Sequence, residues 1–413
     1  MTPRERLFAL GQFGIKLGLD NIRTILAALG DPQHRWPSIH VGGTNGKGSV
    51  VAMVERALRA SGLRTGRYTS PHLDRIEERV AIDGAAIDHA TFDETTGEVF
   101  TAIDSLMAAG TLPVTPTFFE VSTAVAFEIF RRQRVEVAVV EVGLGGRFDA
   151  TNVLTPRLTA ITSIALDHER HLGRTLADIA FEKAGIAKPG VPLVIGRLAD
   201  EAAARIVKVA SDVGAPIVDA HAVTEARAYP SLALAGRHQR DNAAVAVAIL
   251  ETWSATVGHI AAEAILTGLT DCEWPARLEW LRLADGSEVL IDAAHNPAGA
   301  AALASYLEDI RSPRLPIVFA AMVDKDLAGM ITALAPVASM FVATTVPHAR
   351  ARSAQGMAGE IRKHAPSVEV IAADTPEAAV TRALAHARKV VAAGSIYMVG
   401  PLRARLIEAG AIH

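Results

Sequence analysis

The pattern of hydrophobic positions predicts alternating strands and helices over most of the chain. Short apolar runs rich in β-branched residues are separated by longer Ala/Leu-rich segments in which apolar positions recur at the helical period. Buried strands are predicted at 39–42, 135–142, 159–164 and 192–195, and amphipathic helices at 49–60, 119–131, 176–187 and 241–253. This alternation is typical of an α/β fold with a mostly parallel sheet covered by helices.

The same alternation restarts after Trp274-Pro275. Further strands are predicted at 289–292, 317–321, 340–344, 368–372 and 395–399, with helices in the gaps. We therefore predict two α/β domains: a larger one at 1–275 and a smaller, Rossmann-like one at 284–413, joined by a linker at 276–283.

Composition and charge narrow the class of protein. The chain has 413 residues, of which 50% are hydrophobic, and its 41 Lys+Arg are balanced by 45 Asp+Glu. Because no basic field is present to hold a polyanion, we do not expect nucleic acid as a partner. The single cysteine, Cys272, excludes an internal disulfide and a cysteine-built zinc site, which suits a reducing cytosol.

Targeting signals are also missing from the pattern. The N-terminus has no apolar stretch followed by a cleavage site, and no apolar run reaches the length that spans a bilayer. We expect a cytoplasmic protein that does not bind membranes. No heptad or exposed apolar stripe is evident, so the pattern does not argue against a monomer.

Candidate chemistry begins at the glycine-rich segment Gly43-Thr-Asn-Gly-Lys-Gly-Ser49, between a predicted strand and a predicted helix. Unpaired amides and a helix N-terminus in this context favour a bound phosphate, with Lys47 against the β- and γ-phosphates. Ser49 can cap the helix and reach a metal ion. The spacing leaves an alternative open, an ordinary turn with a solvated lysine, because Gly48 stands where the P-loop pattern has Ser or Thr.

Several segments carry a resemblance to known families. The loop 43–49 resembles that of the Mur ligase superfamily, in which glycine follows the lysine. Further segments are similar, in the same order, to the dihydrofolate synthase/folylpolyglutamate synthase family: Tyr68–Gly84, Thr117–Phe127, Glu141–Asn152, Asp167-His168, Glu182–Ile186, His238-Gln239 with Asn242-Ala243, Asp292–Pro297 and Asp324–Asp326. The resemblance implies an N-terminal P-loop ATPase domain and a C-terminal glutamate ligase domain, with ATP between them.

The implied reaction is the ligation of L-glutamate to 7,8-dihydropteroate, to a reduced folate, or to both, with ATP and Mg²⁺. A carboxylate does not react with an amine at neutral pH because oxide is a poor leaving group. ATP would therefore convert the acid to an acyl phosphate, which the amine of glutamate attacks. Catalysis of such a reaction consists largely of positioning and of neutralising charge.

The resemblance also assigns site residues. The nucleotide is expected at Thr44, Asn45, Gly46, Lys47, Gly48, Ser49, Asn242, Arg277 and Asp292; the metal at Ser49, Ser70, Glu141, His168 and Lys183; and the pteroate end of the acid at Thr117, Phe148, Asp149 and Ala150. Lys47, Lys183, His168 and His295 are the candidate catalytic residues. Lys183 is expected to carry a carbamate, which requires a neutral amine and is favoured by burial near other cations.

Each assignment has an ordinary alternative. Ser70 precedes proline as many turn residues do, Glu141 could be a solvated strand end, and His168 a loop histidine at the surface. Lys183 could be a surface lysine of a helix, paired with Glu182 or with the end of that helix. His295 is equally suited to cap a helix beginning at Pro297, and Phe148 to pack in the core.

Some positions depart from the family pattern. Lys16 stands where some relatives have an acidic residue, and Ala293 follows Asp292 where relatives often have glycine or a bulkier residue. The segment 347–350 matches the arginine-bearing loop only loosely, so the motifs do not decide whether Arg350 or Arg352 recognises glutamate.

Two other functions stay open at this stage. One is a Mur-type ligase acting on another acid, although the segments Thr117–Glu120 and Asp149–Asn152 favour folate. The other is a P-loop regulator that hydrolyses ATP without ligation, for which the set Glu141, His168 and Lys183 would be unnecessary. Whether one or both folate reactions occur is not decided by these motifs.

Overall fold

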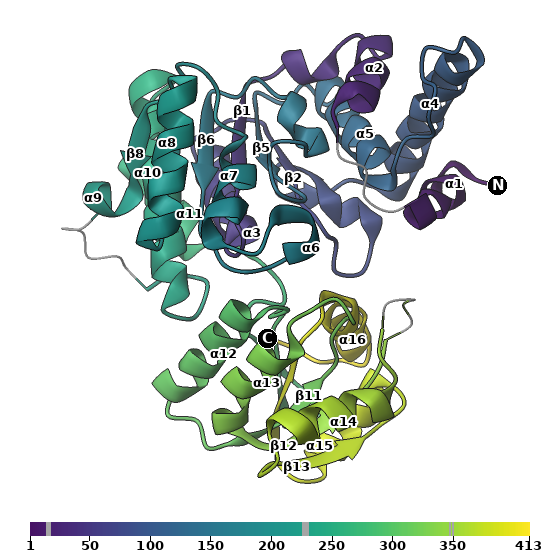
Figure 1. Cartoon of the computed structure of the whole chain (residues 1–413), viewed down its shortest axis with the longest axis vertical. Coiled ribbons are helices and arrows are strands. Elements are labelled where there is room, and N and C mark those ends of the chain that lie inside the picture. The colour runs from purple at the N-terminus through teal and green to yellow at the C-terminus, as the bar shows by residue number, and fades with distance from the viewer. Residues whose placement is uncertain (14–17, 225–230, 347, 349–350) are drawn as a thin grey trace. The chain divides into compact units, whose positions relative to one another are not determined.

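The computed structural model describes residues 1–13, 18–224, 231–346, 348 and 351–413. These residues form two compact α/β units (Figure 1). The first unit contains residues 1–165, 172–231 and 241–272, and the second contains 166–171, 232–240 and 273–413. Two short segments from the first two thirds of the chain therefore belong to the C-terminal unit.

The first unit is built on an eight-stranded sheet with the order β4-β3-β2-β5-β1-β6-β7-β8. Its strands are β1 (Ser38–Gly42), β2 (Thr65–Tyr68), β3 (Val80–Ile82), β4 (Ala85–Ala86), β5 (Val137–Glu141), β6 (Leu158–Ile161), β7 (Leu193–Ile195) and β8 (Ile217–Asp219). All pairs are parallel except β2/β3 and β3/β4 at one edge. From β1 the chain runs to β2 on one side and later to β6 on the other, so the carboxyl end of β1 is a topological switch point, where such sheets bind ligands.

Helices cover this sheet on both faces. The helices of this unit are α1 (Pro3–Ala9), η1 (Leu10–Phe13), α2 (Asp20–Ala28), η2 (Pro32–His34), α3 (Lys47–Ala60), η3 (Ile76–Arg79), α4 (His89–Ala108), α5 (Phe118–Arg132), η4 (Ala150–Val153), α7 (Leu176–Ala184), α8 (Asp200–Val213), α9 (Ala220–Thr224), α10 (His238–Thr256) and α11 (Ala262–Thr270). The short helix α6 (Glu169–Leu172) falls mostly within the segment 166–171 of the second unit. Alternate residues of β5 explain the two covered faces: Ala138 and Val140 pack in a core with α4 and α5, whereas α3 lies against β1, β2 and β5.

The second unit has a six-stranded sheet with the order β13-β12-β11-β14-β10-β9. Its strands are β9 (Glu279–Arg282), β10 (Glu288–Ile291), β11 (Leu315–Phe319), β12 (Ala338–Ala343), β13 (Glu369–Ala372) and β14 (Lys389–Ala393), and its helices are α12 (Pro297–Asp309), α13 (Leu327–Leu334), η5 (Ala335–Val337), α14 (Ala354–His364), α15 (Pro376–Leu384) and α16 (Ile396–Glu408). Only β9 is antiparallel, at the edge. The expected fold class, a larger and a smaller α/β unit with mostly parallel sheets, is confirmed.

One predicted strand is wrong. Residues 395–399 begin helix α16, and the last strand of the sheet is β14, at Lys389–Ala393. Gly394, at φ 114°, ends that strand, and its Cβ position would lie 2.4 Å from the carbonyl oxygen of Ala320. A short apolar run suits a buried helix as well as a buried strand, so period alone misassigned it. The segment predicted as a linker, 276–283, contains β9; the domain boundaries themselves stay a prediction.

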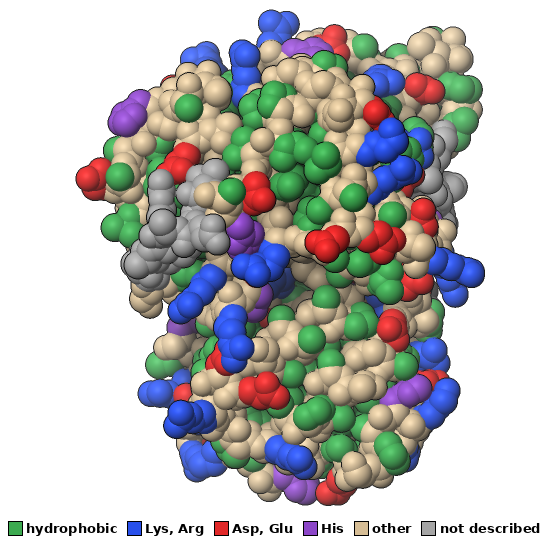
Figure 2. All heavy atoms as spheres, turned by 60° about the vertical axis from the view of Figure 1, so that its left-hand side comes forward, with side chains coloured by type: hydrophobic (Ala, Val, Ile, Leu, Met, Phe, Trp, Pro, Cys, Tyr) green, Lys and Arg blue, Asp and Glu red, His purple; other side chains and the backbone are tan. Residues whose placement is uncertain are grey.

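The surface carries both signs of charge. Figure 2 shows acidic and basic side chains interspersed with apolar and uncharged ones on the face that it presents. Within the described part of the chain, every helix is too short or too polar to span a bilayer.

Candidate active site

The glycine-rich loop follows β1 and leads directly into α3. Gly43 has φ 138° and Gly46 has φ 85°, values that favour glycine. A side chain at either position would also clash with its neighbours. A Cβ at Gly43 would lie 2.0 Å from Thr162 Oγ1, and one at Gly46 would lie 2.2 Å from Asn242 Oδ1. Asn242, predicted to contact the nucleotide, therefore lies directly against the loop.

Hydrogen bonds tie the loop to the segment that follows β6. The backbone amide of Asn45 donates to Ser163 Oγ at 3.0 Å, and Thr162 Oγ1 donates to the carbonyl oxygen of Asn45 at 2.6 Å. Thr44 Oγ1 donates to the carbonyl oxygen of Ala165 and accepts the amide of the same residue. The loop is thus held in shape by its neighbours, as a preorganised phosphate cradle requires.

Two lysines converge on this loop. Lys47 Nζ donates to the carbonyl oxygens of Gly43, at 3.2 Å, and Thr44, at 3.1 Å, and lies 3.8 Å from Glu141 Oε1. Lys183 Nζ donates to the same Gly43 oxygen at 2.9 Å. The alternative of a surface lysine paired with Glu182 is wrong, because Lys183 is buried and Glu182 pairs with Arg147 at 2.7 Å.

Oxygen atoms suited to Mg²⁺ lie at the ends of β2 and β5. Glu141, the last residue of β5, is buried rather than solvated, and its Oε2 accepts the amide of Ser70 at 3.2 Å. Ser70 Oγ is buried and has no hydrogen-bond partner among the described residues. Such an orphaned hydroxyl beside a carboxylate fits a hard cation that prefers oxygen ligands.

Two further observations bear on the metal. Ser49 is buried in the first turn of α3. No group of three or more His, Cys, Asp or Glu side chains is arranged as a metal site in the described ranges. Serine hydroxyls and a modified lysine are outside those four residue types, so the predicted ligand set remains a prediction.

Of the residues predicted for the pteroate end, Phe148, Asp149 and Ala150 follow β5, and Thr117 precedes α5. Thr117 is the N-cap of α5: its hydroxyl donates to Glu120 Oε2 at 2.9 Å and accepts the amide of Glu120 at 3.2 Å. Ala150 is buried in η4. Phe148 is not a core residue, because 36% of it is exposed and the guanidinium carbon of Arg147 lies 4.2 Å from its ring centroid.

Asp149 is buried and holds this loop together. Its Oδ2 accepts the amide of Leu144 at 2.7 Å, and its Oδ1 accepts the amide of Thr151 at 3.0 Å. Burial raises the pKa of Asp149, and the hydrogen bonds from Thr151, Leu144 and Gly143 oppose that rise.

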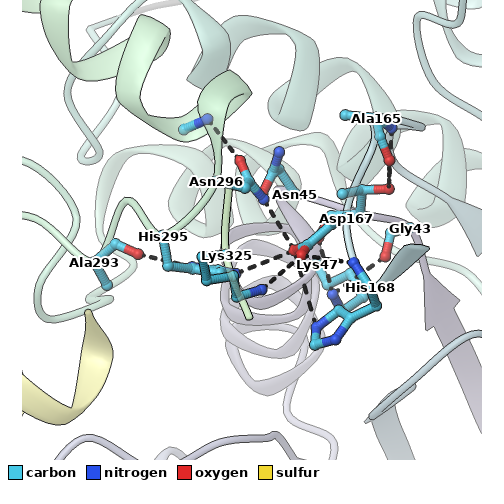
Figure 3. A network of polar contacts seen from close by, with 12 residues as sticks. Gly43, Asn45, Lys47, Ala165, Asp167, His168, Ala293, His295, Asn296 and Lys325 are labelled. Carbon is cyan, nitrogen blue, oxygen red and sulfur yellow. Dashed lines mark hydrogen bonds and ion pairs between the residues drawn. The ribbon is translucent and has the colours of Figure 1, made fainter. Parts of the chain in front are cut away.

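In the second unit, polar side chains converge on Asp167 (Figure 3). Its Oδ1 accepts from Lys325 Nζ at 2.6 Å and from the amide of His168 at 2.8 Å. Its Oδ2 accepts from Asn296 Nδ2 at 3.2 Å and lies 3.6 Å from His295 Nε2. His168 has φ 51°, a left-handed conformation that is unusual for a non-glycine residue.

The pKa of Asp167 is held well below its ordinary value. Burial alone would raise this pKa, but the hydrogen bond from His295 and the charges of His168 and Lys325 outweigh it. The carboxylate is therefore ionised at neutral pH and can fix the cationic and hydrogen-bonding groups around it.

Asp292 and Arg277 lie in the same unit. Asp292 Oδ2 accepts the amide of Leu278 at 2.9 Å, and Oδ1 accepts the amide of Ala294 at 2.8 Å. Burial raises the pKa of Asp292, opposed by the charge of Arg277 and by these hydrogen bonds. Arg277 Nη1 donates to the carbonyl oxygen of Ala276 at 2.9 Å.

The helix that begins at Pro297 is capped by Asn296, not by His295. Asn296 Oδ1 accepts the amide of Gly299 at 2.8 Å. His295 Nδ1 instead contacts the carbonyl oxygen of Ala293 at 2.9 Å. Because a carbonyl only accepts, Nδ1 carries a proton and Nε2 is turned toward Asp167. The capping alternative for His295 is thus wrong.

Three further residues named in the sequence analysis are Lys16, Arg350 and Arg352. Lys16 and Arg350 lie outside the described residues. Arg352 is described, and its Nη1 lies 3.9 Å from Glu360 Oε1.

Sequence reasoning missed several residues that shape these sites. Thr162 and Ser163 hold the glycine-rich loop, and Asp167, Asn296 and Lys325 form the cluster in the second unit. Asp167, Asn296 and Lys325 stand in segments that carry the family resemblance. The motifs therefore contained these residues but assigned them no role.

Comparison with known proteins identifies the class. Residues 276–396 match the family model "Mur ligase, glutamate ligase domain". Together with the P-loop at the switch point, this match defines an ATP-dependent ligase of the acid–amino-acid type.

Full-length relatives identify the family. The chain is 36% identical to the dihydrofolate synthase/folylpolyglutamate synthase of Bacillus subtilis over 79% of its length and 80% of that protein. It superposes with TM-score 0.90 and 32% identity on Mycobacterium tuberculosis folylpolyglutamate synthase complexed with ADP, over 98% of both chains. A bifunctional folylpolyglutamate synthase/dihydrofolate synthase with Mn, AMPPNP and L-glutamate bound gives TM-score 0.85 and 30% identity, again over 98% of both chains. The chain belongs to the dihydrofolate synthase/folylpolyglutamate synthase family.

Proposed function

We propose that this chain uses ATP to join L-glutamate to a folate-type acid, either 7,8-dihydropteroate, a reduced folate, or both in turn. The relative from Bacillus subtilis is named for both activities, and solved relatives hold ADP, or Mn with AMPPNP and L-glutamate. The observation on this chain that carries the proposal is the preformed loop 43–49, with Lys47 and Lys183 directed at it and the orphaned Ser70 hydroxyl beside Glu141.

The reaction proceeds by transfer of the γ-phosphoryl group of ATP to the carboxylate of the acid, which leaves ADP and an acyl phosphate. The amine of glutamate attacks the acyl carbon, a tetrahedral oxyanion forms, and phosphate leaves as the amide is completed. Both steps gather negative charge on oxygen, so the contribution of the protein is to position the groups and to offset that charge.

Lys47 and the amides of residues 45–49 serve the phosphates in this proposal. The ammonium of Lys47 exchanges the two loop carbonyls that it now contacts for phosphate oxygens, a stronger partner because the acceptor is charged. Asn242 and Asp292 with Arg277 are assigned to the rest of the nucleotide.

Ser70, Glu141, Ser49 and His168 would hold Mg²⁺. When bound, the ion would neutralise charge on the β- and γ-phosphates. Lys183 joins this set only as a carbamate, formed when its neutral amine adds to carbon dioxide and releases a proton. Its burial and its hydrogen bond to the Gly43 carbonyl, at the start of the loop, support this assignment. Thr117, Phe148, Asp149 and Ala150 are assigned to the acid, and His295 to proton transfer.

Domain limits and surroundings complete the proposal. We assign ATP and acid binding to residues 1–275 and glutamate ligation to 284–413, in a cytoplasmic monomer. The buried Cys272 and the mixed surface charge agree with that setting.

The first experiment measures ADP release by the purified protein with dihydropteroate and with a tetrahydrofolate, separately, each with and without glutamate. We expect release to require both the acid and glutamate. Lys47→Ala should lower kcat/KM by about 100-fold or more, the scale for losing one preorganised charge-stabilising donor. Lys208→Ala removes an exposed lysine of α8 and is the control.

Two outcomes would redirect the proposal. ATP turnover that is indifferent to any amine acceptor would favour a P-loop regulator. Ligation of glutamate to neither folate acid, with turnover on another carboxylate, would favour a different Mur-type ligase.

A further inference from the structure

A buried polar chain links the central strand of the first unit to the loop after β5. His40, in β1, is fully buried, and its Nε2 lies 2.8 Å from Thr151 Oγ1. Thr151 is also fully buried, and its hydroxyl donates to Asp149 Oδ1. These groups belong to β1 and to the loop around η4, more than a hundred residues apart.

The hydrogen bonds of this buried group all donate in one direction, from His40 through Thr151 to Asp149. Thr151 has one hydroxyl hydrogen, and that hydrogen goes to Asp149, because both carboxyl oxygens of Asp149 already accept backbone amides. His40 must then donate from Nε2 to the same hydroxyl oxygen. His40 Nδ1 has no partner among the described residues, which agrees with a single ring proton placed at Nε2. Burial and the charge of Lys188 lower the pKa of His40 to about 3, so the ring is neutral at working pH.

Asp149, at the end of this hydrogen-bond chain, fixes the conformation of a loop. The two oxygens of Asp149 accept the amides of Leu144 and Thr151, so one carboxylate joins both ends of the segment 144–151. Between those ends lies Phe148, with its partly exposed ring. Movement of Asp149 would therefore shift this ring and the segment that carries it.

Stability of the fold alone does not explain why a histidine occupies position 40 of this buried strand. A buried imidazole with an unpaired nitrogen costs desolvation that an apolar strand residue would avoid. The benefit has to come from the hydrogen bond that it donates.

We propose that His40 is a positioning residue for the acid substrate: through Thr151 and Asp149 it sets the place of the loop 144–151 and so the affinity for the pterin-bearing acid. This inference rests on the proposed function, which assigns that loop to the acid. It predicts that loss of the hydrogen bonds between His40, Thr151 and Asp149 raises KM for the acid, while kcat and KM for ATP change little.

Paired variants separate the hydrogen bond from shape. Thr151→Val keeps the volume and removes the hydroxyl, whereas Thr151→Ser keeps the hydroxyl. His40→Leu removes the donor, whereas His40→Gln retains an N–H at the same reach. We expect Thr151→Val and His40→Leu each to raise KM for the acid roughly tenfold, and the Ser and Gln variants to recover most of it, since a hydrogen bond to a charged group is at stake.

A double variant tests whether the two residues act through one chain. If His40 acts only through Thr151, then His40→Leu combined with Thr151→Val should raise KM no more than the larger single effect. Multiplying effects, or equal shifts in KM for ATP, would overturn the proposal, because the P-loop directly after β1 would then be the affected element. An unchanged KM for the acid in Thr151→Val would overturn it as well.

A spectroscopic measurement is independent of activity. In protein with ¹⁵N-labelled histidine, the His40 signals, assigned by their loss in His40→Gln, should report the Nε2–H tautomer and a neutral ring down to about pH 4. In Thr151→Val these signals should change. The Nδ1–H tautomer in the unaltered protein would contradict the proposal even if ligation occurs. If the unaltered protein shows no glutamate-dependent ADP release, the proposed function fails, while this measurement still decides the direction of the hydrogen-bond chain.

Discussion

Burial governs the protonation of individual side chains in this protein. His40 is shielded on all sides, so its pKa falls to about 3, whereas burial of Asp149 and Asp292 raises their pKa. Asp167 is the opposite case, because several donors and cations around it outweigh the effect of burial on its pKa. Desolvation thus raises the pKa of a carboxyl and lowers that of an imidazole, and the partners of the group decide the net shift.

His40 should make the stability of the first unit depend on pH. An unfolded histidine has a pKa near 6.5, above the folded value of about 3. Below pH ~6.5 the unfolded chain binds a proton that the folded chain does not, so the full contribution is present above that pH and is lost as pH falls toward about 3. The slope is at most ~1.4 kcal/mol per pH unit.

Urea unfolding between pH 7.5 and 4 measures this slope. His40→Gln should make the free energy of unfolding fall less steeply with decreasing pH than in the unaltered protein. His34→Gln, at an exposed histidine of the same unit, is the control. Identical slopes for the unaltered protein and His40→Gln would contradict the assigned pKa.

At the scale of elements, the loop between β1 and α3 requires glycine at position 46 for two separate reasons. Gly46 needs a left-handed backbone and also lacks room for a Cβ, because Asn242 lies against it. Gly62, after α3, has nearly the same φ, 87°, but nothing within 4 Å of a Cβ position. The pair therefore separates backbone strain from close contact.

Gly46→Ala and Gly62→Ala should both lower stability by about 1–2 kcal/mol, the cost of a left-handed non-glycine residue. Only Gly46→Ala should also lose affinity for an ATP analogue, about tenfold or more, because the methyl group displaces Asn242 and distorts the loop. Thermal unfolding and calorimetric titration measure the two effects. Equal nucleotide affinity in both variants would show that the contact with Asn242 is not needed.

Elements were predictable where pattern and period agree. The four buried strands and four helices predicted for the first unit are all present, with ends shifted by a few residues. Residues 395–399 were misassigned because an apolar run has no distinguishing period. The short strands β2, β3, β4, β8 and β9 were not predicted. Strands of two to four residues are stabilised by pairing with their neighbours rather than by a pattern of their own.

At the scale of the whole molecule, the second unit is assembled from three parts of the chain. The segment 166–171 joins it through Asp167, whose ion pair with Lys325 spans 158 residues. Both side chains are about nine-tenths buried, with 8% and 11% exposed. A buried pair of this kind is costly to break, because the remaining charge stays without its partner.

Asp167→Asn should therefore destabilise the second unit by roughly 3 kcal/mol, whereas Lys389→Met, which breaks a more exposed pair with Glu288, should cost less than about 1 kcal/mol. Hydrogen exchange of the amides of β11, in the middle of the second sheet, measures the change. The double variant Asp167→Asn with Lys325→Met should recover part of the loss, since no ammonium is then left buried. Equal exchange in Asp167→Asn and Lys389→Met would contradict the account.

The amino-acid sequence by itself determined the alternation of strands and helices, the glycine-rich loop with Lys47, and the motifs that place the chain in its family. These are local properties, carried by a few adjacent residues or by a period of two or 3.6. The tertiary structure decided which polar groups meet: Asn242 with Gly46, His40 with Thr151, and Asp167 with Lys325 and Asn296. Such contacts depend on which strands become neighbours and on how far each chain segment travels before it returns, and no local pattern of residues records that.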